Sequence, residues 1–211
     1  MPDTSDHKTP VVSPPPQAPA PIDRKSLNAP NLITLSRLLL AFVLFGLIYV
    51  EGFWIESAVL FAVAAATDFL DGYIARKYGL VTTLGRILDP FVDKIIVCGA
   101  FVFLLEKSGT SGVNSWMVMA VIGREMFVTG LRSFLEQSGQ DFSATWSGKI
   151  KMALQCVAVI ASLLSLSPEF EQVASFILAR DILLWLAVAV TTYSGLVYAW
   201  RGFQMLRGPA A

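Results

Sequence analysis

The chain has 211 residues, enough for one domain and too few for two ordinary ones. Hydrophobic residues make up 55% of it and the mean hydropathy is +0.61, which argues against a soluble globular domain and for a bilayer. The 16 basic and 16 acidic residues cancel, so the overall charge gives no reason to expect a nucleic-acid partner.

Residues 1–28 differ from the rest of the chain. Seven of the 11 prolines lie between Pro2 and Pro21, among Ser, Thr, Gln and Ala. Such a stretch buries too little apolar surface to offset its ordering entropy, so we expect a disordered Pro-rich segment. It has no apolar core ahead of a small-residue cleavage site, and we therefore do not expect a signal peptide.

Six apolar runs of spanning length follow, separated by Gly, Pro, Ser and charged residues. They cover Leu32–Val50, Phe53–Ile74, Leu84–Leu105, Trp116–Leu135, Ile150–Leu166 and Ile182–Trp200. The pattern predicts an all-α integral membrane protein with six transmembrane helices, built as one domain over residues 29–208.

The basic residues predict the orientation of these helices. Most lie before the first helix, between the second and third, before the fifth and after the sixth, whereas the alternate connections hold only Lys107 and Arg180. Cytoplasmic loops are enriched in Lys and Arg, so we expect both termini and the 76–86 connection to be cytoplasmic.

Four aspartates stand within or at the ends of the second and third runs, where a charge near the bilayer centre costs about 2.5–3.5 kcal/mol. Asp71 and Asp89 each lie nine residues from Leu80, the approximate centre of the turn, and Asp68 and Asp93 lie 12 and 13 residues from it. Antiparallel helices rising about 1.5 Å per residue bring these carboxylates to matching depths.

Four carboxylates held together repel one another, and a hard divalent cation relieves that repulsion. The spacing therefore predicts a site for Mg²⁺, Mn²⁺ or Ca²⁺. The alternative for isolated acids is that they cap helices or reach water.

The same residues belong to a longer pattern that resembles the signature of the CDP-alcohol phosphotransferase family. All eight defining positions are present with the family's spacing, in Asp68-x2-Asp71-Gly72-x2-Ala75-Arg76-x8-Gly85-x3-Asp89-x3-Asp93. The small residues let a nucleotide or a neighbouring helix come close, although plain helix packing would also explain them. The arginine can bind two oxygens of a diphosphate.

The resemblance implies a reaction in which an alcohol attacks a CDP-activated lipid and CMP leaves. It implies one or two ions, Mg²⁺ or Mn²⁺, on Asp68, Asp71, Asp89 and Asp93, with Asp93 also the catalytic base for the acceptor hydroxyl. It implies CDP-lipid contacts at Asn31, Thr34, Gly72, Arg76, Thr82 and Gly85. It further implies a homodimer with a cytoplasmic active site, in a bacterial inner or cell membrane.

Three further segments resemble bacterial phosphatidylglycerophosphate synthases within that family: residues 28–37, residues 124–132 and residues 146–151. A phosphorylated acceptor needs cations, since Arg binds phosphate bidentately and Lys supplies a point charge. The resemblance thus implies CDP-diacylglycerol and glycerol 3-phosphate as substrates. The candidate phosphate-binding residues are Arg37, Arg124, Arg132, Lys149 and Lys151.

Several alternatives stay open at this point. Lys149, Lys151 and Arg132 could be ordinary positive-inside flanks, and Arg124 could simply pair with Glu125 or another acid. The acceptor could be phosphatidylglycerol, as in a cardiolipin synthase, or inositol phosphate. A cation transporter would also bury acids, but here the acids gather toward one face and no paired broken helices are evident.

Overall fold

The computed structural model describes residues 29–78, 83–137 and 146–206, with side chains at 34–67, 88, 91–135, 148 and 150–205. These parts of the chain form six long helices and one single-turn helix, joined by short connections. The Pro-rich segment 1–28 lies outside them. In chain order the helices are α1 Ala29–Val50, α2 Trp54–Tyr78, α3 Thr83–Glu106, α4 Ser108–Ser111, α5 Ser115–Gln137, α6 Trp146–Leu164 and α7 Ala174–Leu206.

Each of the six predicted apolar runs corresponds to one long helix, which confirms the all-α prediction. The largest difference lies in α7, which begins at Ala174, eight residues before the predicted Ile182. The charged pair Arg180 and Asp181 suggests a helix boundary in the sequence. In the structure Arg180 is buried, and its charge is satisfied by hydrogen bonds to other segments. The helix can therefore continue through this position.

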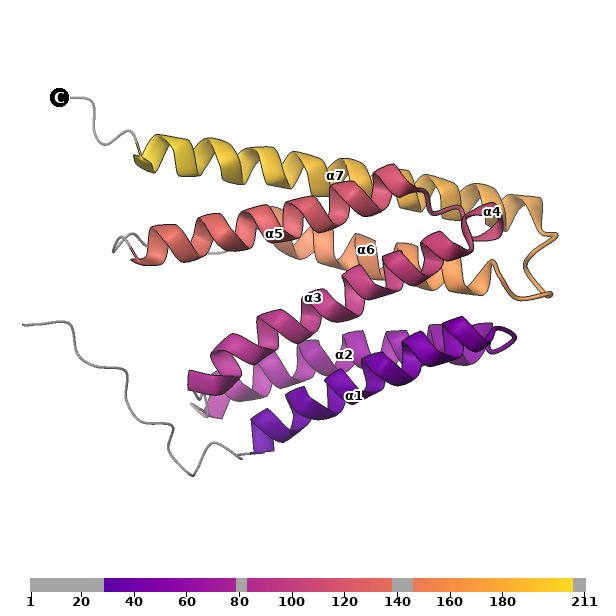
Figure 1. Cartoon of the computed structure of the whole chain (residues 1–211), viewed down its shortest axis with the longest axis horizontal. Coiled ribbons are helices and arrows are strands. Elements are labelled where there is room, and N and C mark those ends of the chain that lie inside the picture. The colour runs from indigo at the N-terminus through magenta and orange to yellow at the C-terminus, as the bar shows by residue number, and fades with distance from the viewer. Residues whose placement is uncertain (1–28, 79–82, 138–145, 207–211) are drawn as a thin grey trace, which may run out of the picture.

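The long helices run alternately up and down the long axis of the molecule (Figure 1). At one end, here called the terminal end, lie the first residues of α1, α3 and α6 and the last residues of α2, α5 and α7. The α1–α2 turn, α4 and the α6–α7 connection lie at the opposite end, here called the far end. The first helix therefore begins and the last helix ends at the same end, as an even number of spans requires.

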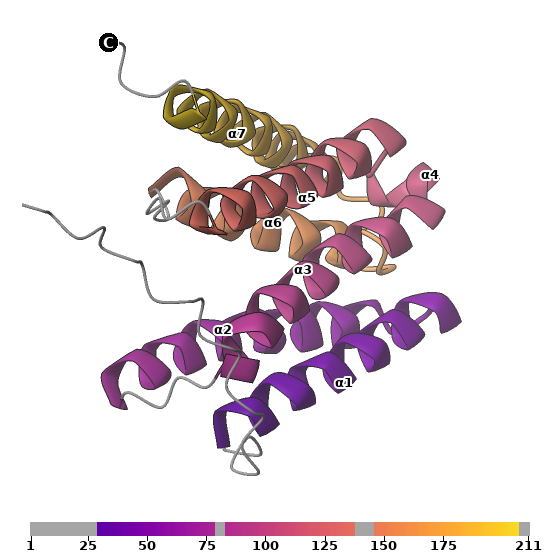
Figure 2. The same cartoon turned by 60° about the vertical axis from the view of Figure 1, so that its left-hand side comes forward.

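The bundle consists of two halves of three long helices, α1–α3 and α5–α7 (Figures 1 and 2). Within the first half, α1 packs against both α2 and α3; within the second, α7 packs against both α5 and α6. The halves meet where α2 packs on α6 and where α3 packs on α5 and α6. The predicted acids belong to the first half, and most of the predicted cations belong to the second.

A close contact between aromatic rings and a glycine joins α1 to α3. The Phe45 ring stacks on Phe103 with centroids 4.9 Å apart. A Cβ atom placed on Gly99 would overlap the Phe45 ring. Only glycine admits the ring at this position, so Gly99 sets how closely the two helices approach.

At the far end, Arg180 of α7 forms hydrogen bonds that join α7 to α4 and to the end of α6. Its guanidinium donates hydrogen bonds to the Thr110 carbonyl of α4, to Ser165 Oγ just after α6, and to Oδ1 of the neighbouring Asp181. Gly112 follows α4 at φ 74°, in the left-handed region that favours glycine, and a Cβ there would meet the Arg180 side chain. Arg180 therefore has a structural role at this end.

Many large apolar side chains point outward. Among the described residues, one helix, Ala174–Met205, is long and apolar enough to cross a membrane by length and composition. Shorter apolar helical stretches cover Thr34–Val50, Trp54–Thr67 and Ile150–Leu164. Large apolar side chains that are at least half exposed occur on all six long helices and include Leu39, Phe42, Val43, Val59, Val63, Phe91, Met119, Met126, Ile150, Leu178, Trp185 and Leu196.

Candidate active site

The helix bounds place the four predicted metal ligands at two matching levels of α2 and α3. Asp71 lies seven residues before the end of α2 and Asp89 six residues after the start of α3, each about 10 Å from the terminal end. Asp68 and Asp93 lie ten residues from the same helix ends, at about 15 Å. The backbone thus agrees with the predicted match in depth.

Of these four carboxylates, only that of Asp93 is among the described side chains. Within the described residues, no three His, Cys, Asp or Glu side chains gather as a metal site. The convergence of the four aspartates on an ion therefore stays a prediction.

Asp93 forms an ion pair with Arg37, one of the predicted acceptor-binding cations. Arg37 Nη2 lies 2.5 Å from Asp93 Oδ1, and the pair joins α1 to α3. The Arg37 side chain is 3% exposed and that of Asp93 is 26% exposed. A charge-assisted hydrogen bond of this kind fixes the direction of the carboxylate.

A small cavity of about 40 Å³, lined by charged and polar residues together with Val97 and Met152, opens beside Asp93. Asp93 and Lys94 come from α3, Glu125 from α5, and Lys151 and Gln155 from α6. The space is large enough for a water molecule, and its walls offer both donors and acceptors. The cavity brings the predicted base and the predicted cation Lys151 to one place.

Arg124 is held by three neighbours in the second half of the bundle. Its Nη1 donates to Glu125 Oε1 at 3.1 Å, and its Nη2 donates to Ser194 Oγ at 2.8 Å. Its guanidinium carbon lies 5.4 Å from the centre of the Tyr198 ring, within reach of a cation–π contact. The pairing with Glu125 that the sequence left open is therefore present.

Lys151 is buried and also bonds to Glu125, since its ammonium donates to the same oxygen, Oε1, that accepts from Arg124. One carboxylate on α5 thereby joins a cation on α5 to a cation on α6. This arrangement differs from that of a solvated helix flank, because all three side chains are at most 12% exposed.

The other predicted cations lie apart from this cluster or cannot be placed. Arg132 is half-buried about 12 Å further along α5 than Arg124 and does not line the cavity. Its Nε has no hydrogen-bond partner among the described residues. The Lys149 side chain lies outside the described set.

Of the predicted CDP-lipid contacts, Thr34 is buried in α1. Asn31 belongs to the same helix, Gly72 and Arg76 to α2, and Gly85 to α3, all toward the terminal end. Their contacts, and Thr82 as a whole, lie outside what the structure describes.

Four polar residues near the cations are absent from the sequence prediction: Gln155, Thr191, Ser194 and Tyr198. Ser194 and Tyr198 hold Arg124, and Gln155 donates to Thr191 Oγ1 at 2.9 Å. Thr191, Ser194 and Tyr198 recur at intervals of three and four in an apolar helix. Polar residues repeated along one face of an apolar helix indicate a polar partner on a neighbouring helix. This spacing could have identified them from the sequence.

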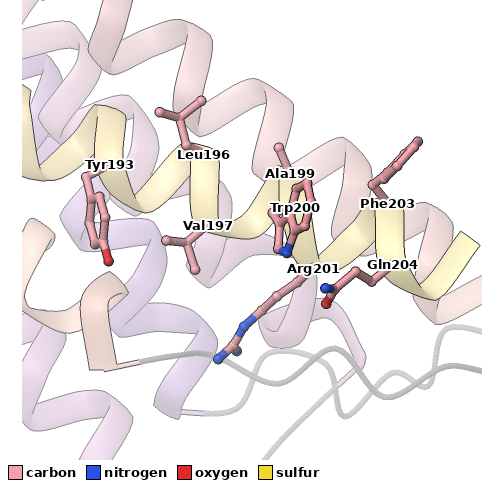
Figure 3. Close-up of a pocket in the computed structure, with 8 residues that line it drawn as sticks. All are labelled: Tyr193, Leu196, Val197, Ala199, Trp200, Arg201, Phe203 and Gln204. Carbon is pink, nitrogen blue, oxygen red and sulfur yellow. The ribbon is translucent and has the colours of Figure 1, made fainter.

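A separate groove of about 780 Å³ lies on the surface of α7 near its last turns. Its described walls all come from α7 and are mainly apolar, with Arg201 and Gln204 on one side (Figure 3). None of its lining residues belongs to the predicted site. They are Tyr193, Leu196, Val197, Ala199, Trp200, Arg201, Phe203 and Gln204.

The sequence is similar to curated bacterial proteins named CDP-diacylglycerol–glycerol-3-phosphate 3-phosphatidyltransferase. The Bacillus subtilis protein is 38% identical over 194 residues, covering 85% of this chain and 97% of that protein. The Rickettsia typhi protein is 34% identical, with 81% and 94% covered, and the Pseudomonas fluorescens protein is 36% identical, with 82% and 88% covered.

The family model described as CDP-alcohol phosphatidyltransferase matches residues 27–193, which include all four aspartates and all five predicted cations. The match also spans the described helices from α1 into α7. Both comparisons cover most of the chain, and the protein belongs to the CDP-alcohol phosphatidyltransferase family.

Proposed function

We propose that this protein transfers the phosphatidyl group of CDP-diacylglycerol to sn-glycerol 3-phosphate, giving phosphatidylglycerophosphate and CMP. The acceptor hydroxyl oxygen forms a bond to the lipid-side phosphorus, and the bond from that phosphorus to the bridging oxygen of CMP breaks. The hydroxyl proton passes to Asp93. Curated relatives of nearly the same length carry the name of this reaction.

The observation that carries the proposal is the cavity between the two halves, where Asp93 lies beside Lys151. A phosphorylated acceptor needs a base near its hydroxyl and a cation near its phosphate. Asp93 from α3 and Lys151 from α6 meet both needs at one place. Free serine or choline would have no use for the buried cations.

We infer that Asp68, Asp71, Asp89 and Asp93 hold one or two Mg²⁺ or Mn²⁺ ions. An all-carboxylate donor set suits these hard cations, and the matching helix levels of the four residues agree with a shared site. When bound, such an ion neutralises the diphosphate and stabilises the departing CMP.

The protein's own groups then orient the two substrates. Arg37 fixes the direction of the Asp93 carboxylate that accepts the proton. Arg124 and Lys151 bind the acceptor phosphate. Arg132 and Lys149 add positive charge toward the terminal end. The family pattern supports Asn31, Thr34, Gly72, Arg76, Thr82 and Gly85 as contacts to the CDP-lipid.

We further propose that the six long helices all span a bacterial cell membrane, with both termini and the active site on the cytoplasmic side. The outward apolar side chains and the basic residues near the terminal end support this orientation. Trp116 is 82% exposed in the first turn of α5 and Trp200 is 63% exposed in the last turns of α7, as expected of anchors at two interfaces. A homodimer is the expected assembly, and light scattering in detergent would measure it.

The test is CMP release by the purified full-length protein with CDP-diacylglycerol and a panel of acceptors. We expect turnover with glycerol 3-phosphate and little with phosphatidylglycerol, inositol phosphate or serine. Mass spectrometry should identify phosphatidylglycerophosphate as the lipid product. Preferred turnover with another acceptor would contradict the proposed substrate and keep the family chemistry.

A further inference from the structure

Glu125 stands at the centre of the buried charges of the second half. Its side chain is 12% exposed, and its Oε1 accepts from Arg124 Nη1 at 3.1 Å and from the Lys151 ammonium. Glu125 and Lys151 both line the cavity beside Asp93. Glu125 takes no part in the proposed transfer of the phosphatidyl group or of the proton.

A buried ammonium loses its hydration and needs a counter-charge to remain charged and in place. Lys151 is surrounded by the cations Lys94 and Arg124 as well as by Glu125 and Asp93. Glu125 is the acid bonded to Lys151 in the described part of the chain. Without it, the charged form of Lys151 would be less favourable and its position less defined.

The bonds to Glu125 leave other donors available. An ammonium has three N–H groups and Glu125 Oε1 occupies one of them, while the Lys151 side chain faces the cavity. The Arg124 guanidinium is fixed on two sides, by Glu125 and by Ser194, and against the Tyr198 ring. Its Nε is buried with no hydrogen-bond partner among the described residues.

We propose that Glu125 is a positioning residue that holds Lys151 and Arg124 as a preformed receptor for the phosphate group of the acceptor. This inference rests on the proposed function and deepens it, since it assigns the acceptor specificity to a third, negatively charged residue. Two cations already held in place lose little freedom when the phosphate arrives, and binding is stronger for that reason.

Two effects of removing Glu125 oppose each other. Loss of its negative charge makes the cavity more positive, which would strengthen phosphate binding over a distance. Loss of its hydrogen bonds frees both cations and disfavours the charged form of Lys151. The second effect acts through direct contacts in a buried site, where charge interactions are much stronger than in water, and we expect it to dominate.

The experiment measures CMP release at varied glycerol 3-phosphate for wild type and Glu125→Gln, a replacement of similar shape without the charge. We expect KM for glycerol 3-phosphate to rise about tenfold or more, with kcat changed less than about threefold and KM for CDP-diacylglycerol unchanged. Glu56→Gln, an equal loss of charge at an exposed position of α2, is the matched control and should match wild type.

A double mutant separates positioning from a general structural role. If Glu125 acts through Lys151 as well as Arg124, Glu125→Gln should raise KM by a clearly smaller factor in the Lys151→Gln background than in the wild type. Independent, multiplying effects would overturn the proposal. A fall of kcat and of the melting temperature, with KM for both substrates changed alike, would also overturn it by showing that Glu125 only stabilises the fold.

The outcomes for the wild type distinguish this inference from the proposed function. Wild-type turnover with glycerol 3-phosphate, combined with an unchanged or lowered KM in Glu125→Gln, overturns the positioning role alone. No wild-type turnover with that acceptor overturns the proposed function and this inference with it.

Discussion

Arg37 Nη2 on α1 lies 2.5 Å from Asp93 Oδ1 on α3, and this pair connects a predicted phosphate-binding cation to the predicted base. The arginine is almost fully buried and the aspartate is a quarter exposed. A guanidinium so placed acts first on the carboxylate that it touches. We therefore propose that Arg37 orients Asp93, while its predicted contact with the acceptor phosphate stays a prediction.

Replacing Asp93 by Asn should remove most of the activity. The amide keeps the shape of the side chain but cannot take a proton from the acceptor hydroxyl, and general-base catalysis contributes about 10²–10⁴-fold. We expect CMP release to fall by at least about 10²-fold on that basis. Size-exclusion profiles in detergent should remain those of the folded protein. A turnover near that of wild type would remove Asp93 as the base.

Replacing Arg37 by Gln distinguishes its two possible roles. Because the guanidinium is bonded to Asp93, we expect kcat to fall about tenfold or more while KM for glycerol 3-phosphate changes less than about threefold. Steady-state kinetics with varied acceptor would measure both quantities. A large rise in KM at constant kcat would instead support direct binding of the acceptor phosphate.

Removing divalent metal should abolish CMP release. Dialysis against EDTA is expected to reduce turnover to background, and added Mg²⁺ or Mn²⁺ should restore it, because carboxylate oxygens bind such hard cations. Direct titration of the ion by calorimetry provides a readout besides activity, and Asp68→Asn should weaken that binding. Equal CMP release in EDTA would contradict the metal role.

The Phe45–Gly99 contact predicts a loss of stability when a methyl group is added. Gly99→Ala places its Cβ on the Phe45 ring, and overpacking of this kind costs about 1–3 kcal/mol. We expect a lower melting temperature in detergent. Gly46→Ala on α1 is the control, because a Cβ there meets nothing within 4 Å. Equal melting temperatures for the two variants would show that the helices separate at no cost.

The sequence predicted the helices well because their signal is local. Long apolar runs broken by Gly, Pro and charge define α1, α2, α3 and α5 to within a few residues. The start of α7 was missed because burial of Arg180 depends on contacts from α4 and the end of α6, which no local pattern contains.

The candidate site, like the fold, was predictable from the sequence where its signal is local and not where it depends on packing. The regular spacing of Asp68 to Asp93 predicts which residues share a level of the bundle, since helix geometry fixes it. The partners of each charge depend on how the two halves pack. The bonds of Lys151 to Glu125 and of Arg37 to Asp93 join residues far apart in the chain and became visible only in three dimensions, whereas the pairing of Arg124 with the adjacent Glu125 was already open from the sequence.

The junction at Arg180 fastens α4, the end of α6 and α7 at the far end of the molecule. Arg180 lies at the end of the bundle opposite the levels of the four predicted aspartates. Replacing it should therefore lower the melting temperature through these lost bonds while leaving the residues of the candidate site in place.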